Sequence, residues 1–91
     1  MLSCKSTIMN SLGMHARPAA MISKIAQNAQ QDVWIGDGEN RADASSVIDI
    51  LSIGMTKGTE VRLEVEHKND IQILESIKKL IEQGFGEDTD G

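Results

Sequence analysis

The sequence predicts an α+β domain in which helices cover one face of an antiparallel sheet. Segments that alternate between apolar and polar residues are separated by longer segments with helical periodicity. The clearest alternating segment, EVRLEVE at 60–66, has apolar residues on one side only, which is typical of a strand with one face in water. The chain has 91 residues, which is the size of one domain with one hydrophobic core.

The first predicted elements are a strand over residues 2–9 and a helix that starts near Pro18. The strand has a period of two, and one of its faces holds Leu2, Cys4, Ser6 and Ile8. Proline fits the first turn of a helix because its missing N–H has no partner there in any case. The residues that follow have helical spacing, and one apolar stripe holds Ile22, Ile25, Ala26 and Ala29.

A hairpin is predicted after this helix. The segment DVWIG places Val33 and Ile35 on one face of a short strand. Asp37 and Gly38 form a turn sequence that leads into a weaker strand over residues 39–43.

A short second helix follows the hairpin. Ser45 or Ser46 can cap its start, and Asp49 stands three residues after Ser46, as in an approximate capping box. The helix runs through Ile53 and stops at Gly54.

The last strand and helix complete the order β-α-β-β-α-β-α, with four strands and three helices. The strand over 60–66 points Val61, Leu63 and Val65 inward. Asn69 and Gln72 resemble a helix cap, and the apolar stripe after them holds Ile73, Leu74, Ile77, Leu80 and Ile81. Gly84 is expected in the left-handed conformation, with Phe85 folding back toward Leu80.

Composition narrows the classes of function. The net charge is −5 and aromatic residues make up 2% of the chain, which disfavours a nucleic-acid partner. No run is long and apolar enough for membrane insertion, and no signal peptide is evident. The single cysteine, Cys4, forms no internal disulfide, so we expect a cytoplasmic protein. Cys4, His15 and His67 lack the spacing of a zinc site, so no metal is expected.

The motif GMHARPA, residues 13–19, is the strongest chemical signal. It lies in the only electropositive segment, because residues 1–30 hold three basic residues and no acidic one. A helix N-terminus stabilises anions, and Arg17 adds forked donors that suit phosphate. His15 is nucleophilic and largely neutral near pH 7, so a ring nitrogen can take up a phosphoryl group. Gly13 leaves room for a partner to approach.

The chain resembles the histidine-containing phosphocarrier protein (HPr) family of the phosphoenolpyruvate-dependent phosphotransferase system. The motif G-[apolar]-H-A-R-P-A of that family is complete here, and its second signature is matched in part by ADASSVIDILSIG, residues 42–54. The resemblance covers nearly the whole chain. It implies an open-faced β-sandwich, a four-stranded antiparallel sheet with three helices on one face, over residues 1–86. Residues 87–91 are then a short acidic tail that we expect to be mobile.

The resemblance also implies the roles of the motif residues. His15 would accept a phosphoryl group on Nδ1 from phospho-enzyme I and pass it to a IIA component of the sugar phosphotransferase system. Arg17 would steady the phosphate, and the backbone N–H groups of Ala16 and Arg17 would cradle it. The protein would be a carrier rather than an enzyme, monomeric and without a cofactor. The surface for its partners would hold Met14, Ala20, Met21, Lys24, Val47, Ile48 and Leu51. We expect Met14 to be its most exposed apolar residue, because the neighbouring site must be open.

Two features leave an alternative open. Ser46 stands where many members carry a serine phosphorylated by HPr kinase/phosphorylase, although a serine here also serves as an N-cap. Its neighbours Ser45 and Asp49 depart from the pattern of that site. The segments NSLGMHARPA and EQGFGED are similar to the nitrogen-related branch, NPr. The alternative function is therefore a regulatory, nitrogen-type module that binds other proteins according to its phosphorylation.

Overall fold

The computed structural model describes residues 2–87, and its element order is the predicted one. The strands are β1 (Leu2–Thr7), β2 (Val33–Gly36), β3 (Arg41–Asp43) and β4 (Glu60–Val65). The helices are α1 (Ala16–Ala26), α2 (Val47–Ile53) and α3 (Ile71–Glu82). Two short 3-10 turns, η1 (Lys68–Asp70) and η2 (Gly84–Gly86), flank α3.

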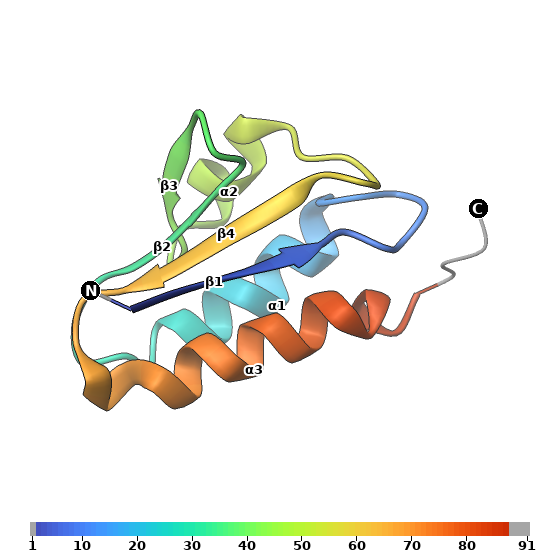
Figure 1. The fold of residues 1–91 in the computed structure, drawn as a ribbon. Helices are drawn as coiled ribbons and strands as arrows, with labels where there is room; N and C mark the ends of the chain where they lie inside the picture. Colours follow the sequence, from blue (N-terminus) through green and yellow to red (C-terminus); the bar gives the residue numbers. More distant parts are fainter. Residues whose placement is uncertain (1, 88–91) are drawn as a thin grey trace.

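The four strands form one antiparallel sheet in the order β1-β4-β2-β3. The strand with the strictest alternation, β4, lies inside the sheet, with Leu63 paired to Cys4 of β1 on one side and to Ile35 of β2 on the other. Figure 1 shows α1 and α3 next to each other on one side of the sheet, with α2 packed at the β2–β3 end. The predicted open-faced α+β architecture is confirmed.

The core lies between the sheet and the helices. The inward residues of β4 are fully buried, as are core residues of the three helices, among them Ile22, Ile50, Ile77 and Ile81. Burying one aliphatic side chain of this size contributes about 1.5–3 kcal/mol, so this interlayer holds the fold together. Cys4 is half-buried against the core, and burial raises the pKa of its thiol.

Two element starts differ from the prediction. Strand β3 begins at Arg41 rather than at residue 39, because the backbone N–H groups of Glu39 and Asn40 donate to Asp37 Oδ1 and extend the turn. Helix α3 begins at Ile71 after the turn η1, so Asn69 is not its cap. The exposed His67 caps η1 instead, accepting a hydrogen bond from the Asn69 N–H.

Asp70 holds the α1–β2 loop. It is 2% exposed, and its two carboxylate oxygens accept hydrogen bonds of 2.9 Å from the backbone N–H groups of Gln30 and Gln31. The bonds satisfy a buried charge and also the donors of a loop that no strand pairs. A polar residue at the start of α3 thus holds the loop between α1 and β2.

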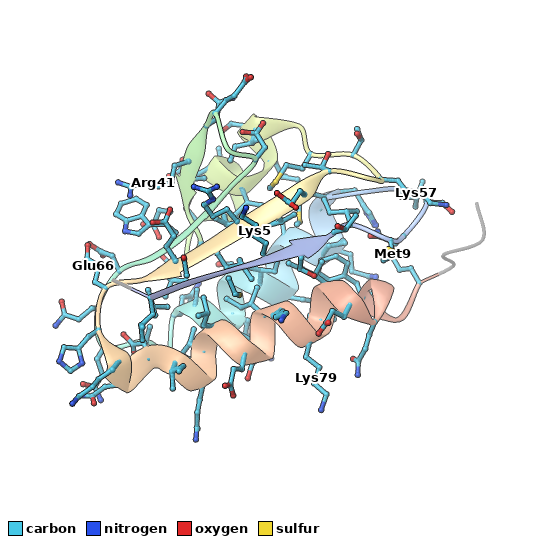
Figure 2. All side chains as sticks on the ribbon, in the orientation of Figure 1. Lys5, Met9, Arg41, Lys57, Glu66 and Lys79 are labelled. Atoms are coloured by element: carbon cyan, nitrogen blue, oxygen red, sulfur yellow. The ribbon has the colours of Figure 1, made fainter. Side chains whose placement is uncertain are left out.

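The other face of the sheet is open and polar. Lys5 and Arg41 lie on this side in Figure 2, and Lys5 Nζ is 3.8 Å from a carboxylate oxygen of Glu60. The Arg41 guanidinium stacks over the Trp34 ring, 4.2 Å from its centroid, which shields an otherwise solvated aromatic. Among residues 2–87 no helix is long and apolar enough to cross a bilayer. Of the tail predicted at 87–91, residues 88–91 lie outside the described residues.

Candidate phosphoryl-transfer site

The position of His15 depends on a glycine turn. Gly13 has φ +67°, and a Cβ on it would lie 2.9 Å from both Met55 O and Thr56 Cα. Glycine is therefore required both by the left-handed backbone and by the close approach of the segment between α2 and β4. The Met14 N–H donates to Met55 O over 2.9 Å, which fixes the loop to that segment directly before His15.

This turn also overturns one prediction. Met14 is 5% exposed and belongs to the core, because the hydrogen bond from its backbone N–H to Met55 O fixes the loop against the segment between α2 and β4. More exposed apolar residues are Leu12 in the same loop, which is 73% exposed, and Ile48 of α2, which is 79% exposed. Leu12 was missed because a single apolar residue in a loop gives no periodic signal.

His15 is the N-cap of α1. Its backbone is extended, and its side chain makes no capping hydrogen bond within the described residues. The imidazole is therefore available for chemistry, with one third of the side chain exposed. An α-helix leaves its first backbone N–H groups without intrahelical partners, and here those of Ala16 and Arg17 come first, followed by Pro18, which has none.

The nearest partner of His15 is a carboxylate from the other end of the chain. The two Glu87 oxygens lie 2.9 and 2.8 Å from His15 Nε2. The Glu87 side chain is only 14% exposed. The hydrogen bond with His15 is the main effect that lowers the pKa of Glu87 below its usual range; burial opposes it, and hydrogen bonds from Asn10 and Arg17 reinforce it.

This contact defines the chemistry of the ring. An ionised carboxylate can only accept hydrogen bonds, so Nε2 of His15 must carry a proton and donate it. In a neutral imidazole the other nitrogen, Nδ1, then has the free electron pair. In a neutral His15 the contact with Glu87 therefore leaves Nδ1 as the ring nitrogen with the free electron pair.

Arg17 holds the same carboxylate in place. Its Nε donates to Glu87 Oε2 over 2.9 Å, and its Nη2 lies 2.8 Å from that oxygen. Nη2 also donates to the backbone carbonyl of Phe85 over 2.7 Å, and Nη1 is 3.3 Å from the sulfur of Met21. The guanidinium therefore ties the end of the chain to α1.

The chain reaches the site through a sharp turn after α3. Gly84, Phe85 and Gly86 all have positive φ, and at Phe85 the value of +56° is costly for a residue with a side chain. The Phe85 ring is 2% exposed and anchored in the core, which maintains this conformation. The predicted left-handed Gly84 is confirmed, and the turn delivers Glu87 to His15.

The residues predicted as a partner surface are divided. Ala20, Lys24, Ile48 and Leu51 are exposed, Met21 and Val47 are half-buried, and Met14 is buried. Helices α1 and α2 are packed together, and Ser23 of α1 donates to the carbonyl of Ser45 over 2.7 Å. Ala20 of α1 and Ile48 and Leu51 of α2 are therefore exposed apolar residues on two helices that pack together.

Ser46 is the N-cap of α2. Its Oγ accepts a hydrogen bond of 3.3 Å from the Asp49 N–H, and Gly54 ends the helix with φ +74°, both as predicted. Ser45 is not the cap, because its N–H and hydroxyl both donate to Asp43 Oδ1. The negative charge of Asp49 in the first turn favours the helix dipole.

Known proteins are similar to this chain in sequence and fold. A family model described as the PTS HPr component phosphorylation site matches residues 2–83. The chain belongs to the HPr family. Phosphocarrier protein NPr of Klebsiella oxytoca is 35% identical over 82 residues, covering 89% of this chain and 91% of that protein. Phosphocarrier protein HPr of Neisseria meningitidis serogroup A is 28% identical over 87 residues, covering 96% and 98%.

A solved structure confirms the architecture. HPr-C-His from Thermoanaerobacter tengcongensis superposes with a TM-score of 0.88 at 31% identity, covering 97% of this chain and 99% of that one. The HPr fold therefore holds from β1 to the end of α3. As a member of the HPr family, the chain has the general role of a phosphocarrier of the phosphotransferase system.

Proposed function

We propose that His15 accepts a phosphoryl group on Nδ1 from a phosphorylated enzyme I and passes it to a IIA-type domain. The observation that carries this proposal is the contact between Nε2 and the Glu87 carboxylate, which leaves Nδ1 with its electron pair. A helix N-terminus next to the ring favours the incoming anion.

The transfer is a displacement at phosphorus. The Nδ1 electron pair of His15 forms the new N–P bond, while the bond between phosphorus and the donor atom of enzyme I breaks and its electrons remain on that donor atom. Because Nε2 keeps its proton, the His15 ring becomes positively charged. The adjacent Glu87 carboxylate stabilises that charge. Onward transfer to the acceptor reverses these changes.

Arg17 is proposed to steady the phosphoryl group together with the backbone N–H groups of Ala16 and Arg17. In the described structure its guanidinium is occupied by Glu87 and the Phe85 carbonyl. A phosphoryl group on His15 would compete with Glu87 for these donors, since both are anions. We therefore expect Arg17 to exchange at least one of these contacts when His15 is phosphorylated.

The proposed docking surface consists of the exposed apolar residues Leu12, Ala20, Ile48 and Leu51 together with the exposed Lys24. A patch of this composition suits a transient contact, in which each partner must bind and then release. The proposed carrier is a cytoplasmic monomer.

The acceptor has two candidates. The first is a IIA component of the sugar phosphotransferase system. The second is a nitrogen-type IIA protein, with the chain acting mainly through phosphorylation-dependent binding. This candidate is favoured by identities of 35% and 34% to NPr of Klebsiella oxytoca and Escherichia coli, compared with 28% to HPr of Neisseria meningitidis and 31% to HPr-C-His of Thermoanaerobacter tengcongensis. Rates of transfer from the phosphorylated protein to purified IIA domains of both types would discriminate between them.

Regulation at Ser46 is a further part of the proposal. Phosphorylation of its hydroxyl would alter the hydrogen bond that caps α2 and place negative charge beside Ile48 in the docking surface. We expect a Ser46→Asp variant to bind enzyme I more weakly than Ser46→Ala, and incubation with HPr kinase/phosphorylase to label the protein at this residue.

The deciding experiment is incubation with enzyme I and radiolabelled phosphoenolpyruvate. We expect a label that is acid-labile and alkali-stable, as for phosphohistidine, and that is lost in His15→Ala. His67→Ala is the matched control, because that histidine is exposed in a turn and should not affect labelling. Failure of a cognate, active enzyme I to label the wild-type protein would contradict the carrier mechanism.

A further inference from the structure

Asn10 is a fully buried polar residue near the start of the loop between β1 and α1. Its side-chain amide nitrogen donates to the Gly13 carbonyl over 2.8 Å and to Glu87 Oε1 over 2.9 Å. The backbone carbonyl of Asn10 accepts a hydrogen bond from the Gly13 N–H over 3.1 Å. One side chain therefore links the turn that precedes His15 to the carboxylate that contacts it.

Only a hydrogen-bond donor fits the position of the Asn10 side-chain nitrogen. Both neighbours of the amide nitrogen, a carbonyl and a carboxylate, are acceptors, so aspartate in the same shape would repel Glu87. The amide oxygen is buried and has no hydrogen-bond partner among the described residues. Leaving such an atom unpaired costs about 1–3 kcal/mol. An apolar side chain would avoid this cost if the position served only to pack the loop.

The two carboxylate oxygens of Glu87 are held by different donors. Asn10 binds Oε1 and Arg17 Nε binds Oε2. His15 Nε2 lies 2.9 and 2.8 Å from the same two oxygens, so the carboxylate is fixed symmetrically in front of the ring nitrogen. Without Asn10, Oε1 keeps only the contact with the histidine itself among these bonds.

We propose that Asn10 is a positioning residue that acts through Glu87 to hold the proton on Nε2 of His15. This inference rests on the proposed function, because its consequence is that Nδ1 keeps the electron pair that attacks phosphorus. Asn10 touches neither Nδ1 nor the phosphoryl group. It sets which tautomer of the ring meets the donor.

The test uses single variants and a double variant. Asn10→Ala and Glu87→Ala are made separately and together in the full chain, and Asn28→Ala is the control. Asn28 donates to the Lys24 carbonyl over 3.2 Å on the exposed end of α1, so it makes a similar local bond away from His15. If Asn10→Ala does not fold, Asn10→Ser keeps a short donor for Gly13 while losing the reach to Glu87.

Two readouts separate positioning from folding. The first is the ¹⁵N spectrum of the His15 ring at neutral pH, which reports which nitrogen carries the proton without any partner protein. The second is the single-turnover rate of phosphoryl transfer from phosphorylated enzyme I.

We expect the wild-type protein and Asn28→Ala to show a protonated Nε2, and Asn10→Ala to show a mixture of tautomers. We also expect Asn10→Ala to transfer about tenfold more slowly and to cause no further loss in the Glu87→Ala background.

An unchanged tautomer in a folded Asn10 variant would overturn the proposal. So would an equal loss of rate with and without Glu87, because Asn10 would then act independently of the carboxylate. If the wild-type protein is not phosphorylated at all, the proposed function fails, and the ring spectrum alone decides the role of Asn10.

Discussion

Gly13→Ala should destabilise the protein more than the same substitution at Gly54, although the two glycines have nearly the same φ, +67° and +74°. At both positions alanine must enter the left-handed region, which costs about 1–2 kcal/mol. A Cβ at Gly54 meets no atom within 4 Å, whereas at Gly13 it lies 2.9 Å from two backbone atoms. Forcing these apart adds about 1–3 kcal/mol, as for overpacking in a core.

The predicted loss of unfolding free energy is therefore about 2–5 kcal/mol for Gly13→Ala and about 1–2 kcal/mol for Gly54→Ala. For a domain of this size 1 kcal/mol shifts Tm by about 4–8 °C, so the melting temperatures should differ by at least several degrees. Thermal and urea unfolding followed by circular dichroism measure both variants. Equal stability of the two would refute the argument that the close approach to Met55 and Thr56 requires glycine.

Three further predictions concern Glu87, the docking surface and Asp70. The pKa of Glu87 is lowered in the folded state, so the ionised carboxylate contributes stability that is present at neutral pH and lost as pH falls through that pKa. The Tm of Glu87→Gln should therefore fall less between pH 7 and pH 3 than the Tm of the wild-type protein. An identical fall in Tm would exclude this contribution to stability. Ile48→Ser should raise the KM for phosphorylated enzyme I while changing stability by less than about 0.5 kcal/mol. The control, Ile71→Ser at the start of α3, should leave this KM unchanged. Equal changes of KM in the two variants would argue against the docking surface. Asp70→Ala should cost about 2–3 kcal/mol by urea unfolding, because two backbone donors lose their acceptor, and a neutral result would contradict this role.

The elements of the fold could be read from the sequence because each has a local cause. Strand β4 alternates strictly because it has one buried face, and α2 is bounded by Ser46 and Gly54, whose capping chemistry acts within a few residues. The predicted start of α3 was wrong because its actual start depends on a contact that is distant in sequence. Asn69 has a good cap composition, but Asp70 is drawn to backbone donors 39 and 40 residues away, which local spacing does not reveal.

The candidate site was predictable only in its first half. His15 and Arg17 are close in sequence at a helix start, so the sequence alone indicated that the two side chains act together on an anion. Glu87 is 72 residues from His15, and its place was predicted as the beginning of a tail. Its local signal was the GFG sequence before it, where glycines permit the turn, but no periodicity indicates where that turn leads.

The distance along the chain between His15 and Glu87 has a consequence for the order in which the protein is made. The histidine is synthesised early and its carboxylate partner among the last residues of the described chain, after the sheet and all three helices have been encoded. Chains are produced from the N-terminus, so a chain interrupted between residues 15 and 87 carries His15 without Glu87. The proton arrangement of the imidazole thus depends on completion of the whole domain, and a truncated product that retains GMHARPA would carry the motif without its proton-holding carboxylate.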